Sequence, residues 1–177
     1  MKTITFDEIE LGGSSAPKQI NKARAIILND EQELFISNYA GCYLLPGGKL
    51  DSFESFEDAL IREINEELGI ALNHADLTPF LCVEQIIKNY LKNDDFGTNH
   101  RHTITKYYII RSNSCLNSTN IVMSEAESKH QLKTFRIGIE GALKLTKENP
   151  TENSRNAYYQ RELVVVLNEL KKHLGQT

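Results

Sequence analysis

One acidic stretch, residues 48–70, constrains the structure of this chain more than any other part of its sequence. Ser55 is followed three residues later by Asp58, which is a capping-box type of helix start. Gly69 can adopt the left-handed conformation in which many helices end. The spacing therefore predicts a helix of roughly four turns between Ser55 and Gly69.

This helix has an apolar face beside an acidic one. At about 100° per residue, its aliphatic residues share one arc, and they are Leu60, Ile61, Ile64 and Leu68. Glu63, Glu66 and Glu67 fall on a neighbouring arc, where like charges three or four residues apart each cost a few tenths of a kcal/mol. Such a face is either a solvated acidic surface or a site for divalent cations, which take hard oxygen ligands.

The spacing around the three glutamates separates these interpretations. In chain order come Gly48, five residues, Glu54, seven residues, Arg62-Glu63, an aliphatic, one residue, Glu66-Glu67, one residue, Gly69 and an aliphatic. This pattern resembles the full Nudix box at every fixed position. The segment 43–48, YLLPGG, is similar to the family's strand-to-loop entry. The family often has Trp where Tyr43 stands and Gly where Phe53 stands, and neither departure affects an expected metal ligand.

The resemblance implies a metal site and a hydrolytic reaction. Glu63, Glu66 and Glu67 would bind Mg²⁺ or Mn²⁺, together with the carbonyl of Gly47. Glu63 and Glu66 would be catalytic, and Glu63 is either a ligand or, in part, the general base on the attacking water. Many family members add an acid from a later loop, for which the candidates are Glu125 and Glu127.

The resemblance also implies positioning roles. Arg62 would orient the glutamates through salt bridges and so belongs to the catalytic group. Glu54 would brace the loop against the helix, and Gly48 and Gly69 would serve the local backbone. Arg24 lies in a predicted strand, where it is either an ordinary exposed residue or a contact to the phosphates of the substrate.

Size and composition limit the remaining possibilities. A chain of 177 residues with 40% hydrophobic and 25% charged residues suits a single soluble domain, 1–177. The net charge of −4 and the lack of a basic run argue against nucleic-acid or membrane partners. With neither an apolar stretch near 18 residues nor a charged-then-apolar leader, we expect a cytoplasmic protein.

The order of elements predicts an α/β fold. Residues 1–17 are expected to form a flexible lead-in that contains a short strand-like piece, 3–6, and residues 20–28 and 33–37 a hairpin. Predicted strands 77–87 and 103–110 flank a polar insert, 88–102, that is either a hairpin loop or a flap over the site. The alternation indicates a mixed sheet covered by helices on both faces, and the resemblance implies the same α/β/α sandwich.

The end of the chain is predicted to be a long amphipathic helix, 153–174. The residues expected on its apolar side are Ala157, Val164, Leu167, Leu170 and Leu174. This helix would either pack against the sheet or form the contact of a homodimer.

The expected activity is metal-dependent hydrolysis of a pyrophosphate bond in a small nucleotide-type diphosphate. The proline associated with ADP-ribose hydrolases is missing, since Gln85 and Ile86 occupy its place. Tyr90 lies slightly too late for the tyrosine associated with dinucleoside polyphosphates, and the chain has no Trp for the NADH signature. Elimination leaves a nucleoside triphosphate. The alternative is a Nudix-fold module that senses a nucleotide without turnover.

Overall fold

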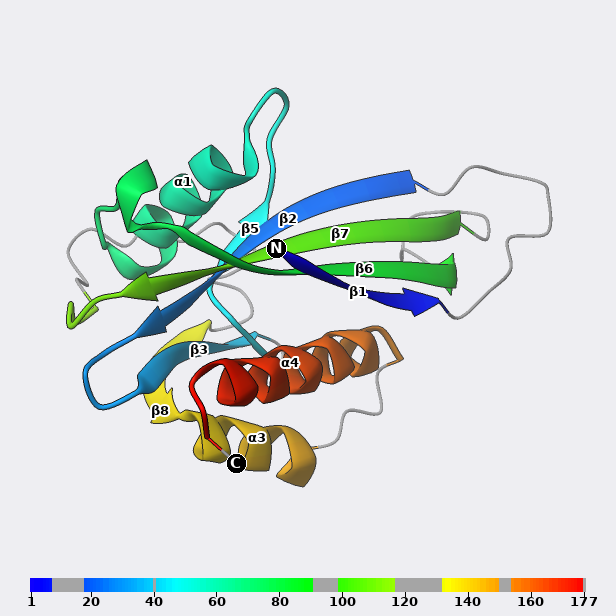
Figure 1. Cartoon of the computed structure of the whole chain (residues 1–177). Coiled ribbons are helices and arrows are strands. Elements are labelled where there is room, and N and C mark those ends of the chain that lie inside the picture. Colours follow the sequence, from blue (N-terminus) through cyan, green and yellow to red (C-terminus); the bar gives the residue numbers. More distant parts are fainter. Residues whose placement is uncertain (8–17, 40, 91–98, 117–131, 150–153, 177) are drawn as a thin grey trace.

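The computed structural model describes residues 1–7, 18–39, 41–90, 99–116, 132–149 and 154–176, which form a mixed sheet between helical layers (Figure 1). The strands are β1 (Lys2–Asp7), β2 (Lys18–Leu28), β3 (Glu33–Tyr39), β4 (Cys42–Leu44), β5 (Gly47–Lys49), β6 (Thr78–Tyr90), β7 (Asn99–Arg111) and β8 (Lys133–Gly138). The helices are α1 (Phe56–Leu68), the short 3₁₀ helix η1 (His74–Asp76), α3 (Ile139–Glu148) and α4 (Ser154–His173).

The sheet combines parallel and antiparallel pairs, as the sequence predicts. Among the described residues it has eight strands, with the path β1-β6-β7-β2-β3-β4, while β5 pairs with β2 and β8 pairs with β3. The pairs β1–β6 and β2–β7 are parallel, and the others are antiparallel. The short strand β5 covers only residues 22–24 of β2, so residues 18–21 of β2 extend beyond it.

Helix α1 begins and ends where its sequence predicts. The Ser55 side chain accepts a hydrogen bond from the Asp58 amide, 3.0 Å away, and Glu57 and Asp58 lie in the positively polarised first turn. Gly69 ends the helix with φ of 66°, a left-handed conformation that costs glycine little. The helix therefore holds its acidic face in a defined place relative to the preceding loop.

Two apolar layers hold the helices on opposite faces of the sheet (Figure 1). Under α1, Leu60, Ile64 and Leu68 pack on alternate residues of β2, including Ala25 and Ile27. The other face carries α3 and α4, and its buried residues include Ile26, Leu28, Leu143, Leu163, Val166, Leu167 and Leu170. Period-two alternation along β2 thus sends one set of side chains to each layer, which confirms the α/β/α sandwich.

The strand-like piece of the N-terminal lead-in is a strand in the structure, and it is slightly longer than expected. Residues 2–7 form the edge strand β1, which pairs in parallel with residues 81–86 of β6. A parallel partner is supplied by a distant part of the chain, so no hairpin signal marks it in the sequence. The Gly- and Ser-rich remainder of the lead-in, 8–17, lies outside the described residues.

The polar insert is shorter than the sequence predicts. Strand β6 continues to Tyr90 and β7 begins at Asn99, which leaves only 91–98 between them, outside the described residues. Strands β6 and β7 stay paired through this polar stretch, where their side chains also contact each other: His102 Nε2 lies 2.5 Å from Glu84 Oε1. Tyr108, which packs under α1, comes nine positions after Asn99 along β7. At the rise of a strand this places the two residues about 30 Å apart. The strand ends that carry the insert therefore do not flank α1.

Helix α4 packs on the sheet through most of the residues expected, since Val164, Leu167, Leu170 and Leu174 lie in or against the core on that face. Ala157 is exposed, whereas Leu163 and Val166 are buried together with the predicted Leu167 and Leu170. The buried stripe starts about two turns into the helix, because the preceding turns lie beside polar side chains of β2 and β7 described below. The described residues contain no helix long and apolar enough to span a membrane.

Candidate functional site

The site is built where β5 leads through a loop into α1. Arg24 of β2 supports this entry, since its Nη1 donates to the carbonyl of Leu45 and, at 3.1 Å, to the carbonyl of Gly47. Arg24 is half-buried, so it is not the ordinary exposed residue that the sequence favours. A contact between Arg24 and substrate phosphates stays a prediction.

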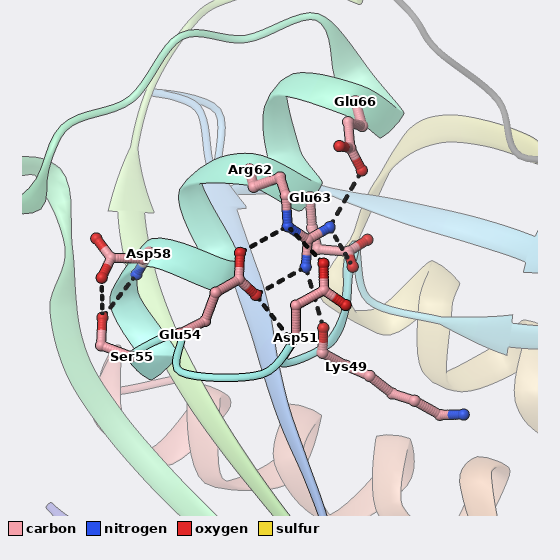
Figure 2. Close-up of polar contacts among 8 residues, drawn as sticks. All are labelled: Lys49, Asp51, Glu54, Ser55, Asp58, Arg62, Glu63 and Glu66. Atoms are coloured by element: carbon pink, nitrogen blue, oxygen red, sulfur yellow. Dashed lines mark hydrogen bonds and ion pairs between the residues drawn. The ribbon is translucent and has the colours of Figure 1, made fainter.

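Arg62 connects the loop to the acidic face of α1 (Figure 2). Its Nε and Nη2 donate to the two carboxylate oxygens of Glu54 at 2.8 and 3.0 Å, a bidentate pairing. Its Nη1 donates to Glu63 at 2.9 Å and to Glu66 at 3.2 Å. Its Nη2 also donates to the carbonyl of Lys49 at 3.1 Å. One guanidinium therefore links the end of β5, the loop and two successive turns of the helix.

Close packing against the two loop glycines places the other acidic groups. A Cβ added at Gly48 would lie only 2.3 Å from Glu63 Oε1, so the carboxylate occupies the space that a side chain would fill. Gly47 has φ of 121°, and its amide donates to Glu67 Oε2 at 2.9 Å. Glycine is required at position 47, where an added Cβ would also lie 2.3 Å from the Ala23 carbonyl oxygen, whereas a side chain at position 48 would displace the Glu63 carboxylate. The loop thus brings Glu63, Glu67 and Gly47 together.

The electrostatics of the cluster leave an excess of negative charge. Glu54, Glu63 and Glu66 all contact the guanidinium of Arg62 at 3.2 Å or less. The hydrogen bonds to Glu54, as the largest cause, and to Glu63 raise the pKa of Arg62 above its ordinary value. The hydrogen bond from Arg62 lowers the pKa of Glu54 in return. Three carboxylates facing one guanidinium give an anionic site that a divalent cation would complement.

The donor set has the chemistry that Mg²⁺ or Mn²⁺ requires. Glu63, Glu66 and Glu67 offer carboxylate oxygens, and Gly47 offers a carbonyl whose second lone pair is not used by Arg24. As placed, these carboxylates face Arg62 and the Gly47 amide, and no group of three or more acidic, His or Cys side chains converges on one point among the described residues. Cation binding therefore needs rotation of the glutamate side chains, with no change of the backbone.

Two candidate residues from the sequence have no described position, and one group of side chains in the structure was not predicted. The later-loop acids Glu125 and Glu127 lie outside the described residues. A group of cationic side chains, which includes Lys22 and Arg101, lies on the face of the sheet that α4 covers. In the sequence Lys22 stands in the polar first half of β2, beside Asn21, so nothing local marks it as buried. Its burial depends on strand order, which local sequence does not show.

Comparison with known proteins identifies the fold and the family. The sequence profile of the NUDIX domain matches residues 19–135. A solved MutT protein from Methanosarcina mazei Go1 superposes with a TM-score of 0.55 at 17% identity, covering 90% of this chain and 99% of that one. A C. elegans Ap4A hydrolase superposes with a TM-score of 0.54 at 15% identity, covering 88% and 98%.

A curated relative provides a local match at higher identity. The 8-oxo-dGTP diphosphatase of Escherichia coli (strain K12) is 36% identical over 66 residues, which are 34% of this chain and 51% of the relative. The chain therefore matches about half the length of that relative. The motif at the start of α1, the three-layer fold around it and the profile match over 19–135 lead to one conclusion: the chain belongs to the NUDIX domain family.

Proposed function

We propose that this protein hydrolyses a pyrophosphate bond in a small nucleotide-type substrate, with Mg²⁺ or Mn²⁺ as cofactor. The observation that carries the proposal is the Arg62 guanidinium, which joins Glu54, Glu63 and Glu66 beside the glycine loop. The curated relative is named an 8-oxo-dGTP diphosphatase, which supports a nucleoside triphosphate as the substrate class.

In this proposal the residues of the cluster have separate tasks. Glu63, Glu66, Glu67 and the Gly47 carbonyl would hold the divalent cation. When bound, such an ion neutralises charge on phosphate oxygens and lowers the pKa of a bound water. Arg62 positions Glu63 and Glu66, because its fork fixes them relative to Glu54 and the loop.

The reaction needs no covalent intermediate on the protein. The oxygen of a water molecule attacks one phosphorus, and the bond from that phosphorus to the bridging oxygen breaks. The proton of the water passes to a carboxylate, for which Glu63 is the first candidate. The departing phosphate carries the electron pair of the broken bond, so the products are two phosphate esters or one ester and inorganic phosphate or pyrophosphate.

A phosphate-release screen over nucleotides and nucleoside diphosphate derivatives, with Mg²⁺ and with Mn²⁺, tests this proposal. We expect turnover of at least one substrate by the wild type, and loss of it in Glu66→Gln. Glu148→Gln is a matched control, because Glu148 is an exposed helical glutamate that pairs with Lys144 on α3, away from the Arg62 cluster. Saturable nucleotide binding without turnover in any condition would instead favour the sensing module.

A further inference from the structure

Lys22 is a buried cation with little to neutralise it. It lies in β2, only 5% exposed, and its Nζ lies 4.4 Å from the centre of the Tyr159 ring on α4. Among the residues that the structure describes, its ammonium makes no hydrogen bond and no ion pair within 4.0 Å. Burying a charge without a hydrogen-bonding partner costs free energy. An anion bound beside the Lys22 ammonium would offset this cost.

The charged neighbours of Lys22 are mostly cations as well. Burial and then Arg24 lower its pKa to about 8, with Arg101 and Lys49 acting in the same direction. Among the described residues, Glu162 of α4 is the anion that raises this pKa, and its carboxylate already accepts the hydroxyl hydrogen bond of Tyr107 at 2.6 Å. At neutral pH Lys22 therefore stays mainly charged within a group of four cationic side chains.

Strand register places two of these cations side by side. Lys22 of β2 and Lys49 of β5 are direct antiparallel partners, so their side chains leave the same face of the sheet. Like charges at such positions repel. Figure 2 shows the Lys49 side chain extending away from the Arg62 cluster, although its carbonyl belongs to that cluster. The backbone of β5 thus contacts the Arg62 cluster with its glutamates, whereas its Lys49 side chain extends away from that cluster.

A pocket is lined both by cationic side chains near Lys22 and by acidic residues of the loop before α1. It has a volume of about 440 Å³ and lies where β2 extends beyond β5. Lys49 and the buried Arg101 line it, together with Asp51 and Glu54 of the loop that Arg62 holds. This volume lies within the range of small-molecule sites. A ligand in the pocket would reach Glu54, the partner of Arg62, together with Lys49 and Arg101, two of the cations whose charges act on Lys22.

We propose that Lys22, Lys49 and Arg101 form an anion subsite that binds a phosphate group of the substrate beyond the pyrophosphate bond that is cleaved. This inference rests on the proposed function, and it deepens it by assigning residues to a preference for nucleotides with three or more phosphates over those with two. The bound phosphate supplies the negative charge that the buried lysine lacks.

Titration calorimetry with inorganic tripolyphosphate, in buffer with a chelator of divalent cations, tests the subsite without any need for turnover. We expect saturable binding by the wild type and an affinity at least about tenfold weaker in Lys22→Met. Lys144→Met is the control, because it removes the same charge from an exposed residue of α3 and should bind like the wild type. Equal affinity of wild type and Lys22→Met, or no binding by the wild type, would overturn the proposal.

Two further variants keep this test separate from the proposed chemistry and from folding. Glu66→Gln should bind tripolyphosphate at least as well as the wild type under metal-free conditions, even though its turnover is lost. Lys49→Met, at an exposed position, serves if Lys22→Met does not fold, and it should also weaken binding. Binding lost in Glu66→Gln but kept in both lysine variants would place the anion at the acidic cluster and contradict the subsite.

Discussion

The two sides of strand β5 differ in charge and in how far local sequence predicts them. On one side, Arg62 gathers three glutamates whose spacing along one helix is visible in the sequence. On the other, Lys22 and Lys49 approach each other only through strand register, and Arg101 lies near them on β7. Local spacing thus identifies the group of residues proposed for chemistry, whereas tertiary pairing creates the group proposed for affinity.

The largest effects should come from the acidic side. Glu66→Gln and Glu67→Gln are each expected to lower kcat by roughly a hundredfold or more, because a neutral amide is a weaker cation ligand than a carboxylate. The fold should persist, since each change also removes like-charge repulsion on α1. Steady-state kinetics at saturating Mg²⁺ with circular dichroism checks both expectations, and near-normal turnover in either variant would remove that residue from the metal site.

Arg62→Lys should have the next largest effect, because one ammonium cannot reproduce the fork that joins Glu54 to Glu63 and Glu66. We expect kcat to fall by about tenfold or more and the free energy of unfolding by about 1–2 kcal/mol. Urea denaturation and steady-state kinetics measure the two effects. A variant with wild-type values of both would show that the guanidinium geometry is unimportant.

Cation binding should stabilise the folded state measurably. A divalent cation at about ten times its Kd adds about 1.4 kcal/mol and raises Tm by about 3–6 °C for a domain of this size, because the unfolded chain holds no assembled site. Differential scanning fluorimetry with Mg²⁺ or Mn²⁺ should show this rise in the wild type and not in the double variant Glu63→Gln/Glu67→Gln. An equal rise in the double variant would place the cation elsewhere.

The cationic side predicts a distinct dependence of stability on pH. The folded-state pKa of Lys22 is about 8 against an ordinary value of 10.5, so between these values the unfolded chain binds more protons. The destabilising effect of Lys22 is therefore complete below pH 8 and fades as pH rises, by up to about 1.4 kcal/mol per pH unit.

The difference in unfolding free energy between Lys22→Met and the wild type isolates this effect, since Glu162, Tyr107 and the other charged neighbours remain in both. Denaturant titrations from about pH 7.5 to 9.5 should show the variant more stable at the lower end, with the difference narrowing at the upper end. A constant difference across this range would show that Lys22 has an ordinary pKa.

The smallest expected effect concerns the loop that joins the two sides. Phe53 has φ of 69° and a fully exposed ring, at the position where the family often has Gly. Phe53→Gly should relieve left-handed strain worth about 1 kcal/mol, partly offset by the greater freedom of glycine in the unfolded chain. Urea denaturation should give a gain below about 1 kcal/mol, while Phe53→Ala, which keeps the strain, should give none.

Sequence patterns anticipated the parts of the molecule that depend on neighbours along the chain. The cap at Ser55, the left-handed end at Gly69 and the buried stripe of α1 follow from local spacing. The pairing of β1 with β6 and the burial of Lys22 depend on partners distant in sequence, which periodicity does not identify. Ala157 was misplaced for the same reason, since a helix stripe becomes a core only where the sheet offers an apolar partner.

One kinetic comparison tests most directly whether the acidic side performs the chemistry and the cationic side binds substrate. On the best substrate of the nucleotide screen, Glu63→Gln should lower kcat by roughly a hundredfold. Lys22→Met should raise KM by about tenfold with kcat within about twofold of the wild type. If Lys22→Met lowers kcat as strongly as Glu63→Gln does, or if Glu63→Gln changes KM alone, the division between the two sides of β5 is wrong.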